Sequence, residues 1–209
     1  GSSTWFGKDV YEIDQSLRFN NGDSSNLSRT PASAGNRKTW TWSGWVKRGN
    51  ITSSPVGTLF GAGTGGNNLD GIEINSVDKL YIYSYNAGYK YRYFTTQVFR
   101  DPSAWYHIMV AYNSTLSTAA HRMRLYVNGL EITDFSTETN PDQNMDTQYI
   151  NNTSPHYMGV GAYATQYFDG YLTEVNFVDG LAKAPADFGT TGDYGEWKPI
   201  KYAGSYGTN

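Results

Sequence analysis

The side chains best suited to binding chemistry are six tyrosines within one short stretch, residues 80–94. They form two alternating runs on either side of Asn86-Ala87-Gly88, a composition typical of a tight turn. Aromatic rings can stack on the apolar C–H faces of pyranose rings, and phenol hydroxyls add hydrogen bonds at the ring edges. The stretch therefore predicts a sugar-binding platform on a β-hairpin, with these expected ligand-binding residues: Tyr81, Tyr83, Tyr85, Tyr91 and Arg92.

The sequence leaves the register of this hairpin open. With a three-residue loop all six tyrosines would share one face, whereas a two-residue loop would place the first three beside Lys90 and Arg92. A slip of one residue moves every side chain to the other face of the sheet. In a second interpretation, half of the tyrosines belong to the core and the others cover a sheet or a contact between subunits.

The composition argues against several other kinds of site. The chain of 209 residues has no cysteine, and its three histidines are far apart, so it offers neither a thiolate nor a zinc-type spacing. It has no G-x-S-x-G motif and no P-loop. A formal net charge of −3 argues against a nucleic-acid partner. No apolar run approaches about 18 residues, which argues against membrane insertion.

The tyrosines must be positioned by strands, because alternation with a period of two runs through most of the chain. Residues 105–113 and 122–127 alternate in this way, and the second run ends at Asn128-Gly129, which predicts a two-residue hairpin turn. Residues 39–47 alternate as well, with Trp40, Trp42 and Val46 on one face.

Two later segments complete the predicted strand pattern. In residues 168–180, alternation predicts one face made of Tyr171, Thr173, Val175 and Phe177. Residues 133–155 are polar and predict a long irregular loop. No helical period is visible, and roughly ten to thirteen short strands are expected. The fold class is therefore all-β, an antiparallel two-sheet β-sandwich of the jelly-roll type.

Four motifs, in this order, resemble those of laminin-G-like, concanavalin A-like lectin/glucanase domains. They are Ser43–Lys47, Trp105–Tyr112, Arg124–Gly129 and Phe168–Val175, which are similar to S-x-W-V/I-K, W-x-H-hydrophobic-x-V, L-Y-V-D/N-G and F-x-G-x-I-x-E-V. The resemblance implies a concanavalin A-like β-sandwich over residues 15–190. Residues 1–14 would then be an N-terminal segment, and residues 191–209 a C-terminal tail or a linker to further chain.

The resemblance also implies a candidate cofactor, because domains of this class often carry a calcium ion on an edge loop. Calcium takes six to eight oxygen ligands in flexible geometry. Asx residues gather in the turn after Phe19 and at the start of the last strand, and the candidate ligands are Asn21, Asp23 and Asp169. A further Asx cluster lies in residues 142–146. Asx-rich turns also form without a metal, because their side chains bond to their own backbone.

Glu12-Ile13-Asp14 resembles part of the E-I-D-x-x-E motif of β-glucanases in this class. A retaining glycosidase needs a second carboxylate about 5–5.5 Å from the first. Ser16 and Leu17 follow here, so that partner is missing. We therefore expect no catalytic residues and no enzyme.

The tail, Gly195–Pro199 with Gly204–Asn209, resembles a segment that follows such domains in virion proteins of marine bacteriophages. This likeness implies a fibre, spike or decoration protein on the phage particle surface. Its partners would be a host cell-surface glycan or polysaccharide and other virion subunits, and the full-length protein would be a homo-oligomer. The alternative is a purely structural virion module that binds neighbouring subunits and no sugar, with a glycoside hydrolase as the third interpretation.

Overall fold

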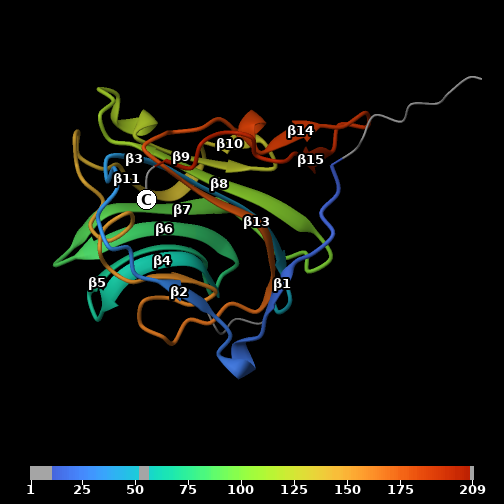
Figure 1. Ribbon diagram of the computed structural model, residues 1–209, viewed down its shortest axis with the longest axis horizontal. Helices are drawn as coiled ribbons and strands as arrows, with labels where there is room; N and C mark the ends of the chain where they lie inside the picture. Colours follow the sequence, from blue (N-terminus) through green and yellow to red (C-terminus); the bar gives the residue numbers. More distant parts are fainter. Residues whose placement is uncertain (1–10, 52–56, 208–209) are drawn as a thin grey trace, which may run out of the picture.

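The computed structural model of the chain describes residues 11–51 and 57–207, and it confirms an all-β sandwich of two antiparallel sheets (Figure 1). Sheet A has six strands in the order β1 (Leu17–Phe19), β13 (Gly170–Asp179), β3 (Thr39–Arg48), β8 (Trp105–Asn113), β9 (Met123–Val127) and β10 (Leu130–Ile132). Sheet B has seven strands in the order β11 (Phe135–Thr139), β7 (Tyr89–Val98), β6 (Lys79–Asn86), β5 (Asn68–Ile74), β4 (Gly57–Gly65), β12 (His156–Met158) and β2 (Leu27–Arg29).

The remaining elements are short. A two-stranded sheet pairs β14 (Gly189–Thr191) with β15 (Trp197–Pro199). Three single 3-10 turns are η1 (Asn21–Asp23), η2 (Ala119–His121) and η3 (Pro185–Asp187). Within the described ranges, no helix has the length and apolar character needed to cross a membrane.

The core forms where the inner faces of the two sheets meet. Trp40, Trp42 and Val46 of β3 are fully buried there, as the alternation of residues 39–47 predicts. The Asn128-Gly129 turn is also confirmed, because Val127 pairs with Leu130 and both turn residues have positive φ, 49° and 80°. These are the angles that a type I′ turn requires.

Two local predictions are wrong. The segment predicted as a loop over residues 133–155 contains β11, which adds to the edge of sheet B by pairing with β7. In β13 the register shifts between Thr173 and Asn176, and Glu174 has a φ of 47°. This bulge turns Val175 and Phe177 toward the core, whereas Tyr171 and Thr173 lie on the outer face.

Residues 188–207 pack against the outer face of sheet A, beside β8 and β13. Phe188 and Tyr202 join a small apolar cluster on that face, and the Tyr206 hydroxyl donates a hydrogen bond to Asn176 Oδ1 at 2.7 Å. Figure 1 shows β14 and β15, in red, on the side of sheet A away from sheet B.

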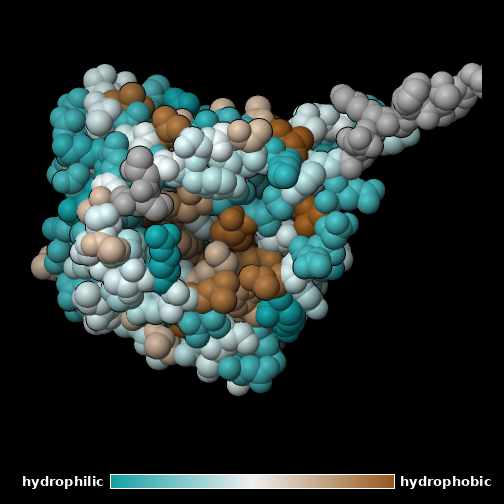
Figure 2. Space-filling model, in the orientation of Figure 1, coloured by the Kyte–Doolittle hydropathy of each residue, from teal (hydrophilic) through white to brown (hydrophobic). Residues whose placement is uncertain are grey.

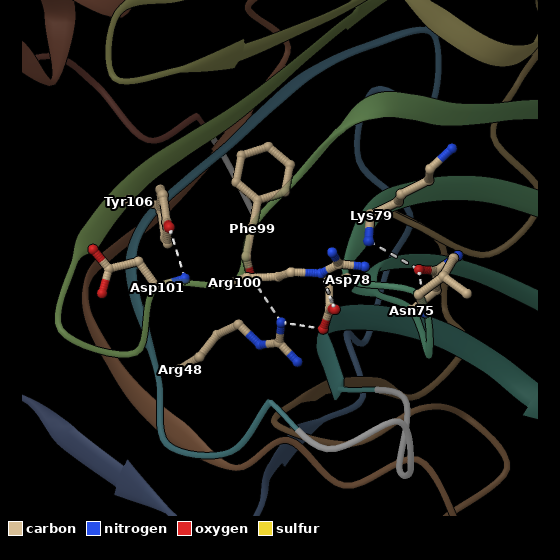
Figure 3. A network of polar contacts seen from close by, with 9 residues as sticks. Arg48, Asn75, Asp78, Lys79, Phe99, Arg100, Asp101 and Tyr106 are labelled. Atoms are coloured by element: carbon tan, nitrogen blue, oxygen red, sulfur yellow. Dashed lines mark hydrogen bonds and ion pairs between the residues drawn. The ribbon is translucent and has the colours of Figure 1, made fainter.

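An ion-pair network connects the two sheets at the start of β6. Asp78 accepts hydrogen bonds from Arg48 at 2.6 Å and from Arg100 Nε at 2.7 Å, and Arg48 also donates to the Phe99 carbonyl at 2.7 Å. Figure 3 shows both arginines reaching toward Asp78. Because Arg48 ends β3 of sheet A and Asp78 precedes β6, this contact fixes the strand that carries the first tyrosines.

Candidate functional site

The tyrosine hairpin consists of β6 and β7, and its register lies between the two predicted alternatives. Tyr85 pairs with Tyr89, but a bulge follows, so that Ser84 pairs with Tyr91 and Tyr83 with Arg92. As a result, Tyr89 and Arg92 share the outer face of sheet B with the tyrosines of β6.

The same bulge turns Tyr91 and Tyr93 into the core. Tyr91 is fully buried, its ring lies 6.0 Å from that of Tyr112, and burial raises its pKa well above the usual value. The prediction that Tyr91 contacts a ligand is therefore wrong in this register, because its ring has no face open to solvent.

Tyr81 and Tyr83 lie on the outer face, but neighbouring rings cover them. Their centroids are 4.4 Å apart, and Phe94 stacks on the other side of Tyr81 at 4.0 Å. Only 8% of Tyr81 and 7% of Tyr83 is exposed, so these residues offer ring edges and hydroxyls rather than stacking faces.

Tyr85 and Tyr89 provide the accessible ring surface. Tyr85 is half-buried, Tyr89 is 44% exposed, and the two rings meet edge to face at 4.9 Å. The Arg92 guanidinium lies over the Tyr89 ring, 4.4 Å from its centroid, in a cation–π contact. Arg92 thus holds one face of Tyr89 and leaves the rest of the ring available.

These tyrosines line a hollow of about 370 Å³ on the outer face of sheet B. Its other walls come from three elements: Asn67 in the β4–β5 turn, Glu73 on β5, and Tyr163 and Gln166 in the loop before β13. Gln166 lines the hollow, but its Oε1 is buried and has no hydrogen-bond partner within the described ranges.

Glu73 is uncharged at neutral pH. It is 3% exposed, and burial raises its pKa to about 8, although a hydrogen bond from the Tyr83 hydroxyl, 3.5 Å from Oε2, opposes this shift. A neutral carboxyl group can both donate and accept hydrogen bonds. The hollow therefore combines aromatic surface with uncharged polar groups.

The residues predicted to bind calcium lie in one region of the fold. Pairing of Phe19 with Gly170 places Asp169 near the turn that contains Asn21 and Asp23. However, the Asn20 amide donates to Asp23 at 2.7 Å, and Asp169 pairs with Arg18 at 2.9 Å.

No group of three or more His, Cys, Asp or Glu side chains converges anywhere in residues 11–51 and 57–207. Calcium binding at this turn stays a prediction. It requires the Asp169 carboxylate to leave its ion pair with Arg18 and to bind the ion instead.

The sequence predicted a binding surface on the tyrosine hairpin but not the other residues that line the hollow. Asn67, Glu73, Tyr163 and Gln166 come from segments distant from the hairpin in the chain, and no local pattern links them to it. Tyr89 belongs to the recognised tyrosine run, but only the register shows that it is the most exposed ring.

A family model described as the concanavalin A-like lectin/glucanases superfamily, Laminin_G_3, matches residues 20–185. No curated protein matches the chain. Solved structures share its fold at low sequence identity. One is the native heptameric SAP-like pentraxin from Limulus polyphemus, with a TM-score of 0.51 and 12% identity over 84% of this chain and 75% of that chain.

Two further similar structures come from bacteria. Domain 4 of AbnA, a GH43 extracellular arabinanase from Geobacillus stearothermophilus, was solved in complex with arabinotriose; its TM-score is 0.54, with 17% identity over 73% of this chain and 65% of that chain. The CBM40 of the Ruminococcus gnavus IT-sialidase has a TM-score of 0.51, with 11% identity over 78% of this chain and 95% of that chain.

Proposed function

This chain belongs to the concanavalin A-like lectin/glucanases superfamily, and from that premise we propose that it is a non-catalytic carbohydrate-binding domain. The observation that carries the proposal is the hollow on sheet B, where tyrosine rings meet uncharged polar groups in about 370 Å³. Aromatic faces for C–H surfaces and neutral hydrogen-bonding groups for hydroxyls are what a sugar requires. The fold shared with an arabinotriose-bound domain and with a CBM40 supports the same proposal.

In the proposed mechanism, one sugar ring stacks on Tyr89 and packs against Tyr85, whose ring stands nearly perpendicular to that of Tyr89. The Glu73 carboxyl and the side chains of Asn67 and Gln166 exchange hydrogen bonds with the sugar hydroxyls, and Arg92 binds at the rim. A single shallow site of this kind binds weakly, and several copies on one particle raise the overall affinity without new contacts.

The finer proposal concerns the setting of the domain. We propose a fibre, spike or decoration protein on a phage particle that recognises a host surface glycan as part of a homo-oligomer. The support is the resemblance of Gly195–Pro199 and Gly204–Asn209 to a segment of marine phage virion proteins. Repeated copies would supply the avidity that weak single sites need.

A glycan array tests the proposal with three purified variants, Tyr89→Ala, Tyr85→Ala and the control Tyr194→Ala. Tyr194 is 94% exposed and lies outside the hollow. Aromatic ring contacts contribute about 0.5–1.5 kcal/mol, so we expect roughly two- to tenfold weaker binding for the first two variants and wild-type binding for the control. Equal binding by all folded variants, or no binding by the wild type across a broad array, contradicts the proposed site.

A structural virion module is the second candidate function, and one feature favours it. A mainly apolar hollow of about 250 Å³ lies between β12, β2 and β13, next to Leu27 and Phe177. Figure 2 shows apolar side chains gathered in a depression on this face. Light scattering after gel filtration distinguishes the candidates: self-association that Leu27→Asp abolishes, together with an empty glycan array, favours the structural module.

A further inference from the structure

Three tryptophans line the outer face of sheet A, on the side of the sandwich opposite the tyrosine hollow. Trp45 lies on β3, Trp105 on β8 and Trp197 on β15. All three border two adjacent hollows, of about 520 Å³ and about 490 Å³. We call this surface the tryptophan face.

Trp197 is held rigidly between the two hollows. Its indole lies against Gly129 and Gly189, where a Cβ at either position would overlap the ring. Its Nε1 donates to His107 Nδ1 at 3.1 Å, and the other nitrogen of His107 meets Ser43 Oγ at 2.8 Å. Burial lowers the pKa of His107 to about 4, so the imidazole is neutral and Nδ1 can accept this bond. A rigid aromatic wall loses little conformational entropy when a ligand binds.

The charged groups that line the two hollows are carboxylates. The exposed carboxylates of Glu12 and Asp14 border the first hollow. Asn128 and Glu196 border the second, where Glu196 pairs with Lys198 at 2.7 Å. The charged side chains that line the two hollows are therefore all carboxylates, and Lys47 lies beside Trp105 on the same face of the sheet.

We propose that the tryptophan face is a second saccharide-binding site that takes neutral hexoses of a polysaccharide chain. The half-buried indoles of Trp105 and Trp197 present stacking surface for the apolar faces of sugar rings, with one hollow on each side of Trp197, whereas Trp45 is 7% exposed and contributes only to the floor of the hollows. Carboxylates accept hydrogen bonds from neighbouring sugar hydroxyls. Glu12 and Asp14 repel sugars that carry carboxylate or sulfate groups. This site shares no residue with the tyrosine hollow and stands independently of it.

A domain with saccharide sites on opposite faces can hold two polysaccharide chains, or two parts of one chain. Binding at the second site then becomes partly intramolecular, and the overall affinity exceeds that of either site.

Affinity electrophoresis tests this inference in gels that contain a mixed-linkage β-glucan, a galactomannan or dextran, with alginate as the acidic probe. The variants are Trp105→Ala, Asp14→Asn and Tyr89→Ala, with Leu181→Ala as a control for loss of an exposed apolar side chain outside both sites. Circular dichroism checks that each variant folds.

We expect at least one neutral polysaccharide to retard the wild type and the Leu181→Ala control. Trp105→Ala should bind it about tenfold more weakly, and Asp14→Asn should gain affinity for alginate. The inference is overturned if no neutral polysaccharide retards the wild type, or if only Tyr89→Ala loses retardation, a result that would leave the tyrosine hollow as the sugar site. If Trp105→Ala fails to fold, the alginate affinity of Asp14→Asn decides whether the tryptophan face binds saccharides: a gain supports the inference, and an unchanged affinity overturns it.

Discussion

Asp78→Asn should destabilise the sandwich strongly, because it removes the negative charge from a buried pair. The Arg48 and Asp78 side chains are 7% and 12% exposed, so in the variant Arg48 keeps its charge but has only neutral acceptors, the Phe99 carbonyl and the amide oxygen introduced at position 78. Breaking a buried pair by removing one partner costs about 3–5 kcal/mol. We expect the free energy of unfolding to fall by this amount at neutral pH.

Arg100→Ala is the matched control. Arg100 contacts the same carboxylate at 2.7 Å, but its side chain is 63% exposed. Solvent-exposed pairs contribute about 0–1 kcal/mol. The control should therefore lose much less stability than Asp78→Asn, although both variants break a contact to Asp78.

The effect of pH provides a second check. Burial alone would raise the pKa of Asp78, but hydrogen bonds from Arg48 and Arg100 and their positive charges lower it below its usual value. A lowered carboxyl pKa gives stability that is present above the unfolded pKa of about 3.9 and lost as pH falls through the folded pKa. Wild type and Asp78→Asn should therefore converge in stability toward about pH 2.

Urea unfolding, followed by tryptophan fluorescence at both pH values, measures these differences. A loss below about 1 kcal/mol for Asp78→Asn at neutral pH would refute the assigned burial of the pair. A gap between the two proteins that stays constant at low pH would show that it does not arise from the charge of Asp78.

Two further predictions concern a neutral acid and a metal. Glu73, with its pKa raised to about 8, should make the wild type lose about 1.4 kcal/mol of stability for each pH unit between about 4.3 and 8, since the unfolded chain there binds fewer protons. Glu73→Gln should gain stability relative to wild type over that window in urea unfolding, and a pH-independent difference would mean that Glu73 is charged in the fold. If calcium binds at the η1 turn, it should raise the wild-type Tm, and a chelator should reverse the effect. Asp169→Asn should show neither change, whereas an equal rise in the variant would place the ion elsewhere.

Local chemistry explains why much of the fold can be predicted from the sequence. The alternation of residues 39–47 separates Trp40 and Trp42 from Ser43 and Trp45 because successive side chains of a strand point to opposite faces. Asn128-Gly129 specifies its own turn, since few other residue pairs accept positive φ twice. The family motifs lie on these same strands.

Bulges limit prediction from alternation, because one extra residue in a strand moves every later side chain to the opposite face of the sheet. The register shift in β13 sends Val175 and Phe177 inward, opposite to the simple alternation. The partners of the tyrosines are unpredictable for another reason. Glu73, Tyr163 and Gln166 meet only after strands distant in the chain have paired, and their identities do not encode that contact.

The bulge in β7 decides what the tyrosine face can bind. In a regular strand, Tyr89 and Arg92 would lie on opposite faces, because they are three positions apart and successive side chains alternate between the faces. The extra residue at Lys90 places both on the outer face and sends Tyr91 into the core. The alternative would bury the Arg92 charge among apolar side chains, at a cost that far exceeds one distorted ladder position. The bulge therefore allows Tyr91 to be buried while Arg92 stays on the outer face. There the Arg92 guanidinium lies 4.4 Å from the centroid of the Tyr89 ring and helps to orient this exposed ring.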